Sequence, residues 1–311
     1  MKYVDMHCDT LTACFDAGAG LADKGFQASY DKLNKSGCAA QCFAVFTQGD
    51  GSALRFEKYL SYFYSEIKRL GIKQILCTAD LDGCIRSGKT GAILTVENLG
   101  FIGDDLKKAE ALSSYGVKMA SLVWNYENAL AMPNLKFADG IPLFSERESG
   151  GLTPLGAKTV EMLDAQKIII DISHLSDGGA LQILKNRKIP IVASHSNAAA
   201  VCGVARNLTD SLIKKIADCG GVIGVNYCKD FLGRGATFAD LLAHVKHIVN
   251  VGGDDAVALG GDFDGIPAPP DLEDCLKVPA LLQYLQDNLG YRLTRKLRHE
   301  NFTRVFRAVC G

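Results

Sequence analysis

The sequence predicts an α/β protein that folds as a (β/α)8 TIM-type barrel with extra helices at its C-terminal end. Short apolar runs recur at fairly even spacing along the 311 residues. The runs are continuous rather than alternating, which indicates strands buried on both faces of a parallel sheet. Amphipathic stretches with helical periodicity separate them. A doubly wound open sheet is the second choice, because it shows the same alternation.

Eight apolar runs are too short for buried helices and are therefore expected to form the strands. In chain order they span residues 3–6, 39–46, 92–96, 117–123, 168–172, 189–193, 222–225 and 256–259. The helices expected between them span residues 54–70, 104–115, 155–165, 178–186, 210–218 and 238–249. Start signals such as Thr153-Pro154 and Thr209-Asp210, and glycines that follow several of the ends, support these assignments.

Two segments depart from this rhythm. Residues 125–151 contain several prolines and glycines with little periodicity, and we expect a loop insertion that lies over the barrel mouth. Residues 276–310 are expected to form extra C-terminal helix, broken around Gly290. We find no convincing linker, so residues 1–311 are expected to form one barrel domain.

Composition excludes several classes of partner. The net charge of −1 and the pI near 6.6 argue against nucleic acid. No apolar stretch reaches membrane-spanning length, and the N-terminus shows no signal-peptide pattern, so we expect a soluble, untargeted protein. The 11 cysteines are scattered, which favours the reducing cytoplasm. The oligomeric state stays open, with a homodimer as one alternative.

Metal-binding residues follow four of the predicted strands. His7 and Asp9 lie two residues apart on an extended segment, so their side chains point the same way and one ion can bind both. Glu97 comes directly after the third strand, and a carboxylate there can bridge two cations. His174 and His195 follow the fifth and sixth strands.

Each of these residues alone has an ordinary explanation, such as a helix cap, a surface glutamate or a core histidine. The C-terminal rim of a closed barrel, however, brings strand ends together. Five nitrogen and oxygen ligands at four strand ends are what a two-metal hydrolytic site requires. The sequence therefore predicts such a site.

The glycine-rich segment 260–265 follows the eighth strand and carries two carboxylates. Asp262 is the preferred general base, which would accept a proton from a metal-bound water, and Asp264 is less favoured. Ser194 and Ser196 lack the glycine context of a nucleophile elbow, so we do not expect a serine nucleophile. His244 and His247 share a helix face without a third ligand nearby, and both are expected at the surface.

The chain resembles the membrane (renal) dipeptidase family of the amidohydrolase superfamily. The resemblance rests on segments in the family's order over nearly the whole length: His7-Cys8-Asp9, Val96-Glu97-Asn98, Gly151-Leu152-Thr153-Pro154-Leu155-Gly156, Ile170-Asp171-Ile172-Ser173-His174-Leu175-Ser176, Ser194-His195-Ser196, Ala205-Arg206-Asn207 and Gly260-Gly261-Asp262-Phe263-Asp264-Gly265.

The resemblance implies a binuclear zinc site in a (β/α)8 barrel. In that scheme His7 and Asp9 hold one Zn²⁺, His174 and His195 hold the other, and Glu97 bridges both as ligand and catalytic residue. The resemblance also assigns two further roles: Arg206 grips the terminal carboxylate of the substrate, and Asp262 shuttles the proton.

One departure from the family pattern lies in the strand-four motif. Characterised dipeptidases of the family carry a histidine there that helps to polarise the scissile carbonyl, whereas this chain reads Leu122-Val123-Trp124-Asn125. The Trp124 side chain has one N–H donor and cannot accept a proton. Asn125 is able to donate to an oxyanion. We expect both residues to contact the substrate.

These observations predict a hydrolase that cleaves the amide bond of a dipeptide through a hydroxide bridging two Zn²⁺ ions. A related metal-dependent amidohydrolase acting on a lactone, an N-acyl amino acid or a cyclic amide is the alternative, and Trp124 favours it. A non-catalytic ligand-binding barrel would require at least one missing ligand, and all five are present.

Overall fold

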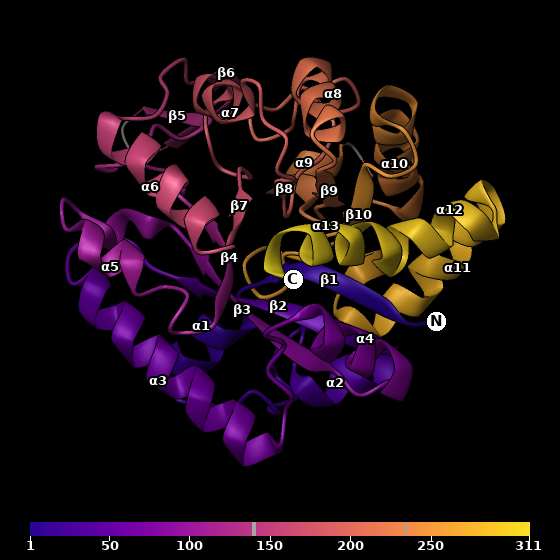
Figure 1. The fold of residues 1–311 in the computed structure, drawn as a ribbon. Coiled ribbons are helices and arrows are strands. Elements are labelled where there is room, and N and C mark those ends of the chain that lie inside the picture. The colour runs from indigo at the N-terminus through magenta and orange to yellow at the C-terminus, as the bar shows by residue number, and fades with distance from the viewer. Residues whose placement is uncertain (139–140, 234) are drawn as a thin grey trace.

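Eight parallel strands close into a barrel in the order β1-β10-β9-β8-β7-β4-β3-β2 (Figure 1). The computed structural model describes residues 1–138, 141–233 and 235–311. Because β1 pairs with both β2 and β10, the sheet has no open edge, and the predicted (β/α)8 barrel is confirmed over the open sheet. The barrel strands are β1 Tyr3–Cys8, β2 Cys38–Phe46, β3 Gly91–Glu97, β4 Val117–Ser121, β7 Ile169–Asp171, β8 Val192–Ala193, β9 Val222–Val225 and β10 Val257–Leu259.

The sixth barrel strand, β8, is shorter than the sequence predicts. Residues 189–193 were expected to be extended, but only Val192 and Ala193 pair with their neighbours. Pro190 has no N–H to donate to a ladder, which accounts for the late start of the strand. All eight strands run the same way, so their C-terminal ends meet at one rim.

Helices surround the barrel, and their starts agree with the predicted signals. The hydroxyl oxygens of Thr153 and Thr209 accept hydrogen bonds from the backbone at the first turns of α6 and α8. The helices are α1 Thr10–Asp16, α2 Tyr30–Ser36, α3 Ser52–Leu70, α4 Thr78–Ser87, α5 Leu106–Glu110, α6 Pro154–Ala165, α7 Asp177–Leu184, α8 Asp210–Asp218, α9 Lys229–Leu232, α10 Phe238–Gly252, α11 Val278–Leu289, α12 Tyr291–Arg295 and α13 Asn301–Cys310. Short 3₁₀ turns occur at η1 Leu99–Ile102, η2 Pro270–Leu272 and η3 Cys275–Lys277, and a π-helical turn at η4 Lys296–Glu300.

Two expectations about helices and histidines are corrected. The helix predicted over residues 104–115 extends only over α5, because side chains beyond it bond to the backbone: Gln166 accepts from Ser113 N, and Ser114 Oγ donates to Ala111 O. His244 is fully buried rather than at the surface. Its two ring nitrogens bond to Ala198 N and Leu232 O, so it ties α10 to the loops above the barrel.

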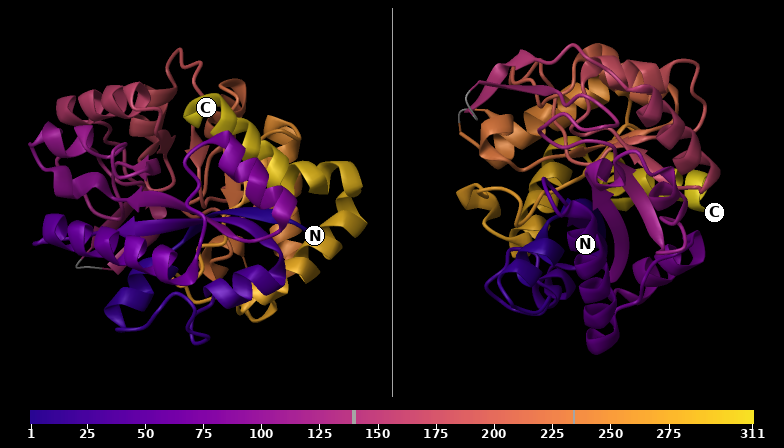
Figure 2. Two further views of the ribbon diagram at one scale, coloured as in Figure 1. Left: turned by 60° about the horizontal axis from the view of Figure 1, so that its bottom comes forward. Right: turned by 90° about the vertical axis from the view of Figure 1, so that its left-hand side faces the viewer.

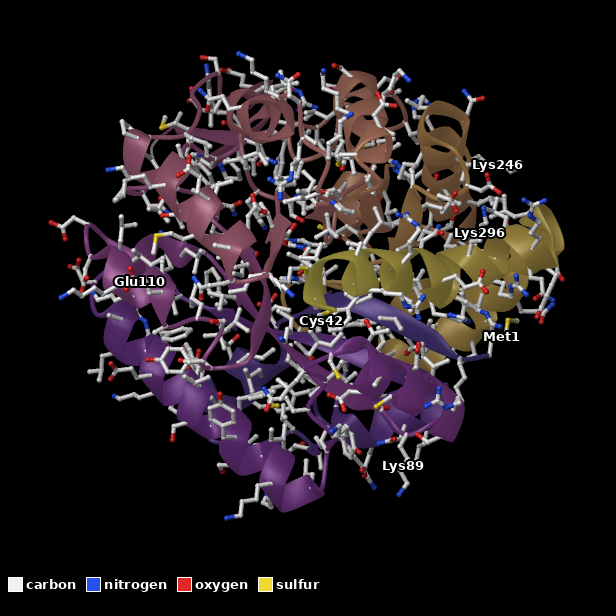
Figure 3. The ribbon with its side chains drawn as sticks, in the orientation of Figure 1. Met1, Cys42, Lys89, Glu110, Lys246 and Lys296 are labelled. Carbon is white, nitrogen blue, oxygen red and sulfur yellow. The ribbon has the colours of Figure 1, made fainter. Side chains whose placement is uncertain are left out.

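The C-terminal region consists of helices, broken at Gly290 as expected. Its last helix, α13, lies across one end of the barrel in Figure 1. Phe302, Val305 and Phe306 of α13 pack in one apolar cluster with residues that point into the barrel, among them Met6 and Ile93. In Figure 3, Cys42 of this cluster lies near the centre of the molecule, while exposed charged side chains such as those of Lys89 and Lys246 lie at its periphery. This helix therefore closes one end of the barrel with apolar side chains.

The insertion at residues 125–151 contains an antiparallel hairpin, β5 Leu135–Ala138 and β6 Ile141–Arg147, that the sequence did not predict. The Arg147 guanidinium bonds to Asp177 Oδ1 and to the backbone oxygen of Asn207, which holds the base of the hairpin against the loops after β7 and β8. In the right-hand view of Figure 2 the hairpin and the C-terminus lie on opposite sides of the molecule. The hairpin thus stands over the barrel end that α13 leaves open.

Within the ranges that the structure describes, none of the helices combines the length and the apolar character needed to cross a membrane.

The barrel wall between β8 and β10 depends on glycine. An added Cβ at Gly260 would lie 1.8 Å from the backbone oxygen of Ser194, whereas one at Gly83 in α4 would meet nothing within 4 Å. We expect Gly260→Ala to lower the free energy of unfolding by about 3 kcal/mol, because backbone must move. Gly83→Ala is the matched control and should stabilise the fold by about 0.5–1 kcal/mol. Thermal and urea unfolding measure the stability of both variants. A Gly260→Ala variant as stable as the parent protein would contradict this packing.

Candidate metal centre

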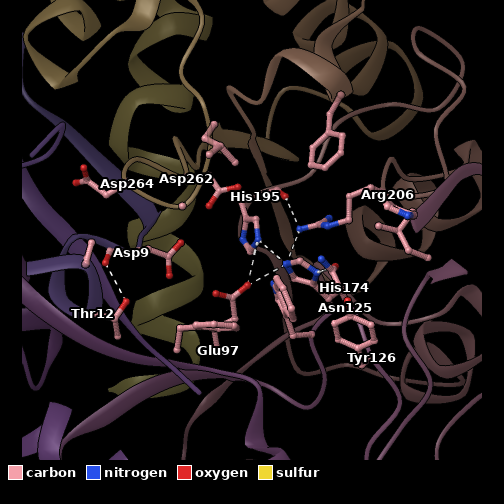
Figure 4. Close-up of a pocket in the computed structure, with 18 of the residues that line it drawn as sticks. Asp9, Thr12, Glu97, Asn125, Tyr126, His174, His195, Arg206, Asp262 and Asp264 are labelled. Atoms are coloured by element: carbon pink, nitrogen blue, oxygen red, sulfur yellow. Dashed lines mark hydrogen bonds and ion pairs between the residues drawn. The ribbon is translucent and has the colours of Figure 1, made fainter. Parts of the chain in front are cut away.

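Four strand ends bring the predicted metal-binding residues together at the open end of the barrel. Figure 4 shows four of them, Asp9, Glu97, His174 and His195. His7 lies in β1 and Glu97 ends β3, while His174 and His195 follow β7 and β8. These four side chains are buried, and Asp9, next along from β1, is only slightly exposed. Closure of the barrel thus gathers residues that are up to 188 positions apart in the sequence, from His7 to His195.

The two oxygens of the Glu97 carboxylate face different histidines. Its Oε1 lies 2.9 Å from His174 Nε2 and 3.7 Å from His195 Nε2. Its Oε2 lies 3.5 Å from His7 Nε2. The carboxylate therefore stands between the imidazole of the first strand and those of the fifth and sixth.

The possible ligand atoms form three overlapping groups, of which two hold the predicted ligands together. One contains Glu97, His174 and His195, and the other contains His7, Asp9 and Asp262; within each cluster the ligand atoms lie within 4.8 Å of one another. A third combination joins His7 and His195 with Asp171. Neighbouring clusters of nitrogen and oxygen atoms are suited to a pair of divalent cations such as Zn²⁺.

Unpartnered polar atoms support this assignment. His7 Nε2 and Asp9 Oδ1 are buried and have no hydrogen-bond partner among the described residues. The nearest carboxylate oxygens lie 3.5 Å from His7 Nε2, which is too long for a good hydrogen bond. Buried polar atoms nearly always have a partner, so both atoms fit the role of metal ligands.

Two hydrogen bonds determine which nitrogen of His174 and His195 faces the clusters. His174 Nδ1 lies 2.9 Å from Asn125 Oδ1, an oxygen that only accepts, so Nδ1 carries the proton. Ser194 Oγ donates to Asp171 Oδ2 and therefore accepts from His195 Nδ1, 2.7 Å away. Both Nε2 atoms are then unprotonated, and they lie 3.0 Å apart. Two lone pairs that converge in this way are characteristic of imidazoles set to bind a cation.

The electrostatics keep these imidazoles neutral. Burial, reinforced by the charge of Arg206, lowers the pKa of His174 to about 4. Burial and the charges of His7 and Arg206 lower the pKa of His195 well below its usual value. Burial opposes ionisation of Glu97, but interactions with His7, above all its charge, lower the pKa of Glu97 below the usual range. A neutral His174, a neutral His195 and an ionised Glu97 are the forms that bind metal.

Asp262, rather than Asp264, faces the clusters. Asp262 Oδ1 lies 3.7 Å from His7 Nε2, and Oδ2 accepts a hydrogen bond from Asn226. The Asp264 carboxylate instead accepts from Thr10 Oγ1 and from the backbone of Gln27 and Ala28, so it anchors a loop. Burial raises the pKa of Asp262 to about 8, with the charge of Asp9 acting in the same direction. Bound cations would act in the opposite direction.

Arg206 is buried beside the same cluster. Its guanidinium donates to Ser196 Oγ at 3.0 Å, to the backbone oxygen of His195 at 3.1 Å and toward His174 Nε2 at 3.1 Å. All three partners are neutral groups, and Arg206 Nε has no partner among the described residues. A buried guanidinium normally pairs with an anion, so this one is suited to bind an anionic ligand.

Trp124 and Asn125 take different positions beside the site. Trp124 lines the pocket and packs edge-on against Phe46, with its ring centroid 6.2 Å from that of His174. Asn125 also lines the pocket, but its side-chain oxygen is bonded to His174. Asn125 therefore orients an imidazole, a role that the sequence alone did not indicate.

Sequence reasoning also missed Asp171 and Ser194, which orient His195. The signal was present in the segment Asp171-Ile172-Ser173-His174, because a buried carboxylate in a strand requires donors. Asp171 obtains them from Ser173 and Ser194.

Five residues of the clusters, Asp9, Glu97, His174, His195 and Asp262, line a cavity of about 460 Å³ at the open barrel end. Its walls come from α1, the hairpin and the loops after β4, β8, β9 and β10. This volume lies in the range of small-molecule sites.

A closed parallel barrel with histidines and carboxylates at its C-terminal rim is the arrangement of a metal-dependent hydrolase. The family model of the membrane dipeptidases, peptidase family M19, matches residues 1–310. The chain belongs to this family of metallopeptidases. An uncharacterised protein encoded 5′ of pqqA in Klebsiella pneumoniae is 31% identical over 249 residues, which cover 76% of this chain and 89% of that protein. An uncharacterised dipeptidase of Schizosaccharomyces pombe is 31% identical over 68% of this chain and 51% of its own length.

Solved structures of metallopeptidases share the fold over the whole chain. The dipeptidase AC, a metallopeptidase of family M19, has a TM-score of 0.91 and 25% identity, covering 100% of this chain and 99% of that one. A metallopeptidase of Rhodobacter sphaeroides, crystallised with a phosphinate mimic of L-Ala-D-Ala, has a TM-score of 0.86 and 24% identity, covering 99% of each chain.

Removing the Ser194 hydroxyl tests the hydrogen-bonded chain to His195. If the clusters bind a divalent metal such as zinc, we expect Ser194→Ala to weaken its binding about 10- to 100-fold, because His195 loses the group that holds its tautomer and ring orientation. Ser196→Ala is the matched control: it flanks His195 on the other side but bonds to Arg206, and should leave zinc affinity unchanged. Competition with a chromophoric chelator measures both. Equal zinc affinities in Ser194→Ala and the parent protein would refute this role.

Proposed function

We propose that this chain is a binuclear zinc-dependent dipeptidase. The observation that carries the proposal is the position of the Glu97 carboxylate, with one oxygen beside His7 and the other beside His174 and His195. Membership of the M19 family supports amide hydrolysis. The convergence of five nitrogen and oxygen ligands supports two ions rather than one.

In this proposal His7 and Asp9 would hold one zinc ion, His174 and His195 would hold the other, and Glu97 would serve as a ligand between them. When bound, the pair would supply an acidified water and an electrophile for the scissile carbonyl. Asp262 accepts the proton of the attacking water and returns it to the leaving amine. The hydrogen bond from Asn226 to Oδ2 leaves Oδ1 directed at the clusters for this transfer.

Arg206 positions the substrate by its terminal carboxylate. Its guanidinium is buried, and its bonded partners are neutral. A planar carboxylate would supply the missing countercharge in a two-pronged geometry. A dipeptide meets this requirement, since its terminal carboxylate lies one residue from the scissile amide.

We further propose that the protein works in a reducing compartment, the cytoplasm. All eleven cysteines lie in the described part of the chain, and each is free. Most are buried among apolar side chains, where a thiol behaves as a small hydrophobe.

Two variants distinguish a metal ligand from the general base. We expect His174→Ala to lose bound zinc and turnover together, because one ion loses a nitrogen ligand. Asp262→Asn should keep about two zinc ions per chain while kcat falls roughly 10²- to 10⁴-fold, since the amide cannot accept the proton. Metal analysis and dipeptide hydrolysis, with and without chelator, measure both. Full activity in Asp262→Asn would remove this residue as the base.

The role of Arg206 is tested with a pair of substrates. Arg206→Gln should lower kcat/KM for Ala-Ala about 10²-fold or more, because the carboxylate loses a charged, two-pronged partner. C-terminally amidated Ala-Ala, which has no carboxylate, should be a poor substrate of the parent and lose much less in the variant. An equal loss with both substrates would show that Arg206 supports the fold of the site instead.

A further inference from the structure

One wall of the cavity is aromatic, and neither metal binding nor proton transfer uses it. Phe46, Trp124, Tyr126 and Phe137 line this part of the cavity and form a continuous series, with ring centroids 4.9, 5.8 and 4.7 Å apart in that order. We call these four residues the aromatic wall. It begins beside the clusters, because the Trp124 ring lies 6.2 Å from the His174 ring.

The hairpin presents only apolar side chains to the cavity. Leu135 and Phe137 of β5 line it, as do Pro142 and Phe144 of β6, whereas Lys136 and Arg147 do not. Alternation along a strand explains the difference, because Lys136 points to the opposite face from its two neighbours. Arg147 is engaged with Asp177 and the loop after β8.

Charged groups lie on other parts of the cavity. Arg206 and the clusters form the floor, while Asp16 and Asp264 contribute from α1 and the loop after β10. The Asp264 carboxylate accepts three hydrogen bonds from its own surroundings, and Asp16 accepts one from the Tyr59 hydroxyl. A substrate side chain that lies against the aromatic wall therefore meets carbon atoms and ring faces.

Part of the apolar surface that borders the cavity is exposed to solvent, which indicates that a ligand covers it. The side chain of Tyr126 is 41% exposed and that of Phe144 is 37% exposed, although both border the cavity. Apolar side chains left accessible around a pocket, rather than scattered over the surface, indicate contact with an apolar ligand group.

We propose that the substrate carries a bulky apolar side chain, aromatic or branched aliphatic, beside its scissile bond, and that this side chain packs on the aromatic wall. The inference rests on the proposed dipeptidase function and specifies the substrate class. Trp124 is central to it, because it joins the part of the wall formed by β2 to the part formed by the hairpin and contacts the His174 side of the floor. Charged side chains at the same position are disfavoured, since they would lose water without gaining a partner.

The test compares kcat/KM for Ala-Ala, Leu-Ala, Phe-Ala, Ala-Phe, Asp-Ala, Lys-Ala, Ala-Asp and Ala-Lys with the zinc-loaded protein. We expect phenylalanine or leucine at one of the two positions to exceed Ala-Ala at least about tenfold, and aspartate or lysine at that position to fall below it. Hydrolysis of Ala-Ala with no gain from an apolar side chain would overturn the inference and leave the proposed function standing.

A pair of hairpin variants tests the wall itself. Phe137→Ala should reduce the ratio of kcat/KM for the preferred aromatic dipeptide over Ala-Ala about tenfold, and Phe137→Leu should retain part of it. Ile141→Ala is the matched control, because Ile141 lies in the same hairpin, is 65% exposed and does not line the cavity. An unchanged ratio in Phe137→Ala would contradict the proposed packing.

A binding measurement separates failure of this inference from failure of the proposed function. Trp124 is the single tryptophan of the chain, so its fluorescence reports directly on the wall. Phosphinate dipeptide mimics with a benzyl or a methyl side chain are titrated into the zinc-loaded protein, and the benzyl compound should bind at least about tenfold more tightly. Tighter binding without hydrolysis of any dipeptide would refute the dipeptidase proposal only, whereas equal affinities would overturn the aromatic wall as a specificity site.

Discussion

A buried carboxylate between imidazoles is the interaction on which this site depends. Glu97 brings a negative charge to the end of β3, where water is largely excluded, and a buried charge is costly unless it has partners. Its partners come from β1 and from the segments after β7 and β8, so they can reach it only when the sheet closes. The buried charge of Glu97 is therefore stabilised only in the closed barrel.

The two ends of the barrel have opposite chemistry, and this contrast makes the site possible. At one end α13 places Phe302 and Phe306 against apolar side chains that point into the barrel. At the other end, the interior carries Asp171, Ser173 and Ser194, which satisfy one another through hydrogen bonds. Close backbone approach at Gly260 and Gly224 holds the segments after β8, β9 and β10 together. The resulting rigid rim fixes the positions of His195 and Asp262.

The fold and the clustered site residues were predictable because they depend on local and periodic signals. Continuous apolar runs indicated parallel strands, and residues that follow such runs lie at the C-terminal rim whatever the intervening loops do. The hairpin was not predictable, since its two strands mix apolar and polar residues and most of their side chains are not buried. The roles of Asn125 and Ser194 depend on contacts to His174 and His195 that no spacing in the sequence encodes. Side-chain hydrogen bonds across loops of this kind become visible only in three dimensions.

The division between strands and loops separates the proposed metal-binding residues from the proposed substrate contacts. The strand ends carry the metal-binding residues, whereas Trp124 and the hairpin belong to loops whose packing does not determine barrel closure. A histidine at position 124 would offer a proton and a charge; the tryptophan offers a ring that continues from Phe46 to Tyr126. Because Asn125 orients His174, the substitution leaves the imidazole supported. In the proposed function, this exchange would remove a polar contact to the scissile carbonyl and add apolar surface beside it, so that recognition would depend more on the neighbouring side chain of the substrate.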